Sequence, residues 1–156
     1  MPDLELIDQL VATYRILNHT VRQRPEANLN QGEKSPRVVV MQLRDTELRF
    51  SQDLKARISG QPVSFAETQE LATLGTEGDH DTTAELIAQF GTARESTLAQ
   101  LRSLPDDQWD VTGDYPRSIR TDVLSLIDHD KQVLDGIGAA LGESLRDTSS
   151  AGASPA

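Results

Sequence analysis

The chain has 156 residues, a formal net charge of −10 and 37% hydrophobic residues, enough for one folded domain with a substantial core. A surface this acidic repels phosphate backbones and anionic lipids, so we expect neither nucleic acid nor a membrane as the main partner. Cysteine is absent, which excludes disulfide bonds, cysteine nucleophiles and cysteine-ligated zinc.

Apolar residues recur at helical spacing along the chain, and no stretch alternates as a strand would. The first predicted helix covers residues 4–23 and is stopped by Pro25. The second covers residues 36–58, with Ser35 as its N-cap and Gly60 suited to its C-cap. Both helices carry one apolar stripe, so each is expected to bury one face.

Two more helices are predicted in the second half of the chain. The third covers residues 83–104, with Thr82 in the N-cap position of a capping box. The fourth covers residues 119–141, preceded by Ser118 and closed by Gly142. The chain therefore has four long amphipathic helices.

The connection between the second and third helices is unusually long. It runs over residues 59–81 and is expected to hold a short helix over residues 66–74. A link of this length can return along a helix of roughly 30 Å, so the second and third helices can run parallel. We therefore predict an all-α four-helix bundle over residues 1–145, with a long crossover between helices 2 and 3. The small, polar residues 146–156 are expected to form a flexible C-terminal tail.

Two charged residues fall on apolar stripes. Asp130 lies between Ile127 and Leu134 on the inner face of the fourth helix, and Arg94 lies on the inner face of the third. Burying either charge alone is costly, so we expect the two to meet. A structural ion pair is the simpler interpretation, and a pair that lines a ligand pocket is the alternative.

A single histidine marks the flank of the same stripe. If the second and fourth helices turn these flanks toward each other, Gln42, His129 and Val133 border one cavity. One imidazole, one amide and one valine are too few donors for zinc or nickel. A metal-free polar position is therefore expected, and a partial metal site at His129 that recruits Gln42, Asp45 or Asp130 is the alternative.

Three other residues were considered as site candidates. His19 points away from the stripe of the first helix and is expected to be exposed. His80 is expected in a loop or capping role before the third helix. Trp109, the only tryptophan, is expected to plug one end of the bundle, with a lid over a pocket as the alternative.

Three stretches of the chain carry a resemblance to a known family. They are SPRVVVMQLRDTELRFSQDLKARISGQ, RESTLAQLRSLPDDQWDV and SIRTDVLSLIDHDKQVLDGIGAAL. In order and pattern the chain resembles the DinB-like (DinB/YfiT) superfamily of four-helix bundles, over about its last three quarters. That family typically binds a divalent metal through three histidines. The resemblance implies that Gln42 stands at the first position, His129 at the second and Val133 at the third.

The resemblance and the residues together predict a DinB-like protein with a degenerate metal site. We expect it to bind a small molecule or a protein partner, or to form a homodimer, without a bound cofactor. The alternative is a divalent-metal-dependent thiol transferase or hydrolase, with zinc or nickel as cofactor and unknown catalytic residues. No apolar run of about 18 residues and no secretory signal order is seen, so a cytoplasmic location is expected.

Overall fold

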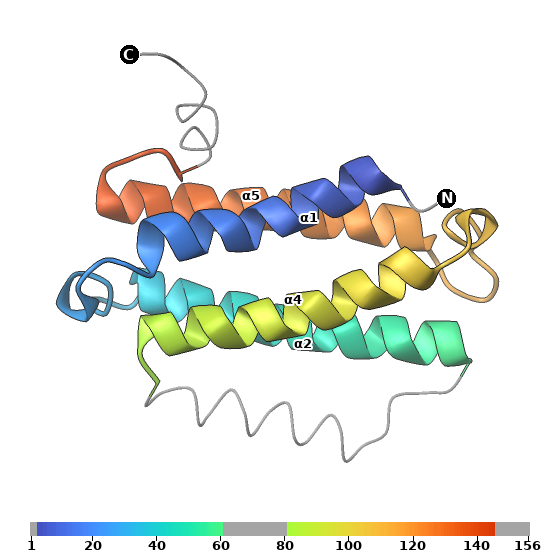
Figure 1. Ribbon diagram of the computed structural model, residues 1–156, viewed down its shortest axis with the longest axis horizontal. Helices are drawn as coiled ribbons and strands as arrows, with labels where there is room; N and C mark the ends of the chain where they lie inside the picture. Colours follow the sequence, from blue (N-terminus) through green and yellow to red (C-terminus); the bar gives the residue numbers. More distant parts are fainter. Residues whose placement is uncertain (1–2, 61–80, 146–156) are drawn as a thin grey trace.

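The computed structural model describes residues 3–60 and 81–145, and all regular structure in these two ranges is helical (Figure 1). The all-α prediction is thus confirmed for the described residues. The predicted short helix over residues 66–74, the loop role of His80 and the tail over residues 146–156 lie outside them. None of the described helices is both long and apolar enough to cross a bilayer.

Four long helices make up most of the described chain. Two short 3₁₀ turns lie in the connections, at Glu26–Asn28 and Asp106–Gln108. The long helices are α1 (Leu4–Ile16), α2 (Pro36–Ser59), α4 (Thr83–Ser103) and α5 (Ile119–Leu141).

The helix ends follow the local signals in the sequence. Each helix begins after a side chain that accepts a hydrogen bond from a backbone N–H of the first turn. Gly60 and Gly142 end α2 and α5 with φ of 74° and 75°, the left-handed conformation that glycine adopts most easily. The four N-caps are Asp3, Ser35, Thr82 and Ser118, and the last three confirm the caps predicted above.

The first helix differs from the prediction in its last turns. The α-helix ends at Ile16, and the chain continues as a π-helical segment over Leu17–Val21. The Thr20 hydroxyl donates to the Ile16 carbonyl at 2.5 Å, a side-chain bond that competes with the regular backbone pattern. Such a local widening leaves the apolar spacing nearly unchanged, so the sequence pattern does not reveal it.

Contacts between helices fix their relative directions. Arg44 of α2 donates to Gln89 of α4 at 2.7 Å, and Ser51 of α2 donates to Ser96 of α4 at 3.0 Å, so residue numbers rise together and the helices are parallel. The Thr13–Asp130 hydrogen bond joins the last turn of α1 to the middle of α5, and these two helices also run in one direction (Figure 1). The α1–α5 pair runs opposite to the α2–α4 pair.

The interior has two apolar clusters with a buried polar layer between them. Each long helix contributes to this layer a buried polar residue that lies between members of the two clusters; these residues are Thr13, Glu47, Arg94 and Asp130. The first cluster includes Leu10, Leu54, Leu98, Trp109 and Val123. The second includes Leu17, Leu43, Phe90, Leu134 and Ile137.

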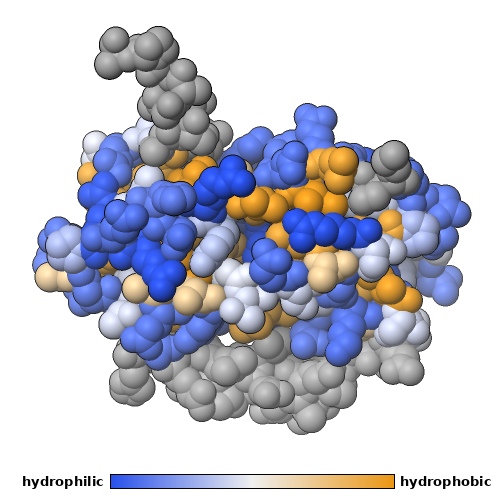
Figure 2. Space-filling model, viewed as in Figure 1, coloured by the Kyte–Doolittle hydropathy of each residue, from blue (hydrophilic) through white to orange (hydrophobic). Residues whose placement is uncertain are grey.

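Trp109 is fully buried in the first cluster, just after α4 ends and before α5 begins. This agrees with the expected plug and does not support a lid. His19 is exposed, as predicted. Figure 2 shows a mostly hydrophilic face with hydrophobic residues gathered where α1 and α5 run side by side. The exposed large hydrophobic residues of these two helices are Leu4 and Leu124, at 60% and 48% exposure.

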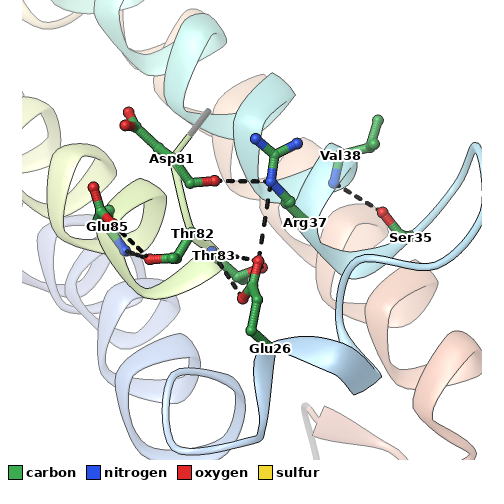
Figure 3. Close-up of polar contacts among 8 residues, drawn as sticks. All are labelled: Glu26, Ser35, Arg37, Val38, Asp81, Thr82, Thr83 and Glu85. Carbon is green, nitrogen blue, oxygen red and sulfur yellow. Dashed lines mark hydrogen bonds and ion pairs between the residues drawn. The ribbon is translucent and has the colours of Figure 1, made fainter. Parts of the chain in front are cut away.

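At the other end of the molecule a carboxylate ties the α1–α2 connection to α4. Glu26 accepts the backbone N–H of Thr83 through both carboxylate oxygens, at 3.1 and 3.0 Å, and the Thr83 hydroxyl at 3.2 Å (Figure 3). Arg37 lies 4.0 Å from Glu26 and donates to the Asp81 carbonyl at 2.8 Å. A negative charge at the N-terminus of α4 satisfies an otherwise unpaired N–H and complements the helix dipole.

Candidate functional site

The predicted contact between Arg94 and Asp130 is present. Arg94 Nη1 donates to one Asp130 oxygen at 2.9 Å, and Nη2 donates to the other at 3.1 Å. The side chains are 1% and 3% exposed, so the pair is shielded from water. A guanidinium that meets both oxygens of a carboxylate is among the stronger ion-pair geometries.

The structure adds two partners that the sequence reading missed. Glu47, with a fully buried side chain, accepts from Arg94 Nη2 at 2.8 Å, and the Thr13 hydroxyl donates to Asp130 at 2.6 Å. Arg94 Nη1 also donates to the Leu10 carbonyl at 2.8 Å. Glu47 lies four residues after Leu43 on α2, so the helical spacing of that apolar stripe was the signal that pointed to it.

The network holds one cation and two carboxylates. Burial by itself lowers the pKa of Arg94, but the charges and hydrogen bonds of Glu47 and Asp130 outweigh it, so the pKa lies above its ordinary value. Arg94 is therefore charged. Glu47 Oε2 has no hydrogen-bond partner among the described residues, so the layer is not fully satisfied.

Asp130 is committed to this network and does not face His129. The two residues are adjacent on α5, about 100° apart around the helix axis. Asp130 borders a small hollow of about 150 Å³ between α1 and α5, which includes Gln9 and Ile127. Asp130 accepts three hydrogen bonds here, and the positive charge of Arg94 beside it disfavours the approach of a metal cation.

His129 borders a larger groove between α2 and α5. Its volume is about 710 Å³, and its apolar lining residues include Phe50, Leu54, Ile119 and Leu126. The Nδ1 atom of His129 is shielded from solvent and has no hydrogen-bond partner among the described residues. A rotation of the His129 side chain would be needed to bring this nitrogen to a ligand in the groove.

The other two positions of the implied metal triad lie elsewhere. Gln42 is exposed, and Val133 is half-buried against the second apolar cluster; neither lines the groove. The groove begins one turn after Gln42, at Thr46. Asp45 accepts from its neighbour Arg44 at 2.7 Å and does not line the groove either.

These positions leave few donors for a metal ion. Within residues 3–60 and 81–145, no three histidine, aspartate or glutamate side chains come together to hold one. One imidazole beside Thr46 does not make the three good donors that zinc or nickel prefers. The described residues therefore do not fit the divalent metal that the DinB-like resemblance implies.

The far end of the groove is charged. Asp122 of α5 lies 3.5 Å from Arg57 of α2 and 2.9 Å from Arg117 in the preceding loop. Arg57 also stacks over the ring of Tyr115, with its central carbon 4.2 Å from the ring centroid. Asp53, one turn before Arg57, is the remaining charged residue that lines this end of the groove. Sequence reasoning named none of these, because they lie on helix flanks and in a loop.

No protein-family model, curated protein or solved structure matches the chain. The likeness to DinB-like proteins therefore stands on the three stretches quoted above. Since a fold does not determine a function, the role of the protein has to be argued from the groove.

Proposed function

We propose that the protein binds a small molecule in the groove between α2 and α5, on a DinB-like four-helix bundle with a degenerate metal site. The observation that carries the proposal is the groove itself, about 710 Å³ with an apolar floor. This volume lies within the range of roughly 300–1,000 Å³ that is usual for small-molecule sites. The parallel α2–α4 pair supports the bundle assignment, because a long crossover connection produces that arrangement.

The donor set favours binding over metal catalysis. His129 is the only member of the Gln42, His129, Val133 set that lines the groove. Asp130, which the alternative would recruit, is held by Arg94 and Thr13. A metal-dependent transferase or hydrolase would need to break this network before it could assemble a third donor.

A protein partner or a second copy of the chain is the other form that the binding role can take. Leu4 and Leu124 are exposed near the starts of the parallel helices α1 and α5, and they favour this side of the molecule. Sedimentation equilibrium tests it: a dimer that dissociates in a Leu4→Glu, Leu124→Glu variant would support the interface, and a monomer at all concentrations would rule out the homodimer.

Small-molecule binding is tested with phenylbutanol, a neutral probe with an apolar body, by nuclear magnetic resonance titration. Ser125 is exposed and lines the groove, so Ser125→Phe should narrow it and weaken binding. Gln132 is exposed on the same helix outside the groove, and Gln132→Phe is the matched control. Binding by Ser125→Phe that is as tight as in the wild type would refute the groove as the site.

Metal analysis of untagged protein tests the alternative. We expect no stoichiometric zinc or nickel in the wild-type protein. Stoichiometric metal that is lost in His129→Ala would support the enzyme and overturn the degenerate-site proposal. Asp130→Asn would then be expected to lower metal affinity about tenfold or more, since ligand-supporting carboxylates have effects of that size.

A further inference from the structure

The charged residues of the groove differ in how far they are already paired. Both arginines use Asp122: Arg117 Nε lies 2.9 Å from one oxygen and Arg57 Nη1 3.5 Å from the other. Arg57 also donates Nη2 to the Val111 carbonyl at 3.0 Å and covers one face of Tyr115. Both cations and the carboxylate between them are thus engaged within the protein.

Asp53 is the exception. It lines the same groove, yet it makes no hydrogen bond and no ion pair within 4.0 Å among the described residues. Burial raises the pKa of its carboxyl, the nearby Arg49 lowers it, and the negative charge of Asp122 raises it again, with a net increase. Asp53 is an exposed residue, so water or a ligand in the groove can reach its carboxylate, and a cation there can pair with it.

We propose that the groove takes a small organic cation, an amine whose ammonium group lies beside Asp53 and whose apolar body lies along Phe50, Leu54 and Leu126. This inference rests on the proposed small-molecule role and names the chemical class of the ligand. An ammonium group offers hydrogen-bond donors, which an unpaired carboxylate accepts.

The dimensions and surroundings of the groove agree with such a ligand. From Thr46 to Arg57 the groove follows three turns of α2, about 16 Å at 1.5 Å per residue. The ring of Phe50 lines the middle of this stretch and offers an aromatic face to a cation. At the Thr46 end, a rotation of His129 would bring its unpartnered Nδ1 to a second polar group on the ligand.

The charge of the whole chain acts in the same direction. A formal net charge of −10 raises the local concentration of cations and lowers that of anions around the protein. An anionic ligand would face Asp53, and the arginine at the same end, Arg117, already has Asp122 as its counter-charge. The electrostatics therefore favour an amine over a carboxylate of the same shape.

The test compares phenylbutylamine, phenylbutanol and phenylbutyrate, three probes with one apolar body and different head groups. Binding is followed by the fluorescence of Trp109, which packs in the same cluster as the groove residues Leu54 and Ile119, and by calorimetry. We expect the amine to bind about fivefold or more tightly than the alcohol, the scale of one partly exposed ion pair, and the carboxylate to bind most weakly.

Asp53→Asn should remove the preference for the amine and leave the affinity for the alcohol unchanged. Asp8→Asn, the same change at an exposed aspartate of α1 outside the groove, should alter neither. A thermal midpoint of Asp53→Asn at or above that of the wild type would show that lost affinity is not a folding defect.

The outcomes separate the two proposals. Three results would show that the amine inference is wrong while the ligand-binding groove stands. They are an alcohol that binds as tightly as the amine, a carboxylate that binds most tightly of the three, and an Asp53→Asn variant that still prefers the amine. If none of the three probes binds, or if Ser125→Phe binds them as well as the wild type does, the groove fails as a site and the inference fails with it.

Discussion

Replacement of Arg94 by methionine removes the only cation of the buried polar layer. The substitution keeps an unbranched side chain of similar length, so the loss is mainly one of charge and hydrogen bonds. Arg94 makes three bonds to the carboxylates of Glu47 and Asp130 and one to the Leu10 carbonyl. The variant leaves two carboxylates with side chains at 0% and 3% exposure without a counter-charge.

The expected loss of stability is large. Removal of one partner from a buried ion pair costs about 3–5 kcal/mol, and the two carboxylates here place the variant near the upper part of that range. A domain of this size has a total stability of about 5–15 kcal/mol. With a denaturant slope of about 2 kcal/mol per molar urea, a loss of about 4 kcal/mol lowers the unfolding midpoint by about 2 M.

Urea unfolding followed by far-ultraviolet circular dichroism measures the effect. Arg102→Met, at an exposed arginine of the same helix, is the matched control and should stay within about 0.5 kcal/mol of the wild type. A triple variant, Arg94→Met with Glu47→Leu and Asp130→Leu, should recover at least half of the loss, because no uncompensated charge is left. A loss below about 1 kcal/mol in Arg94→Met, or a triple variant no more stable than the single one, would refute the reasoning.

Three further changes test the packing, the capping and the groove. A Cβ on Gly91 would stand 2.5 Å from a ring carbon of Tyr14, so Gly91→Ala should lower the unfolding free energy measured in urea by about 1–3 kcal/mol. In a Tyr14→Ala protein the ring is gone, and the same substitution should raise the unfolding free energy by up to about 1 kcal/mol because alanine favours a helix more than glycine does. Glu26→Ala removes the carboxylate that caps α4 at Thr83 and should cost about 1–2 kcal/mol in the same assay. Because the pKa of Asp53 is raised in the folded state, its ionised form opposes folding above that pKa. Asp53→Asn should therefore raise the thermal midpoint slightly at neutral pH, with a gain in unfolding free energy of no more than about 0.5 kcal/mol after solvent screening. Below the ordinary aspartate pKa the substitution should have no effect on the midpoint.

Each of these has its own contrary result. If Gly91→Ala destabilises the Tyr14→Ala protein as much as it destabilises the wild type, the clash is not with the Tyr14 ring. Exposed Glu33→Ala is the control for the capping carboxylate, and an equal loss in both would discount the contact with Thr83. A gain in Asp53→Asn that persists at low pH would assign it to something other than the charge.

The sequence by itself determined where α2, α4 and α5 begin and end and which two charges meet, but not where α1 ends. Caps such as Ser35 and Gly60 act within one turn, so the chain needs no tertiary neighbour to specify them. Arg94 and Asp130 each stood on an apolar stripe without a local partner, and the cost of burying one charge alone was reason enough to pair them.

Only the tertiary structure decided which flank of each helix lines the groove and which lies on the outer surface. A position on the edge of a stripe is buried or exposed according to the packing of its neighbours, and the helical period alone does not resolve that choice. Thus Gln42 lies on the surface while Thr46, one turn later, lines the groove beside His129. The groove joins two flanks and a loop that are far apart in the chain, so its unpaired carboxylate at Asp53 becomes visible only after the helices are packed.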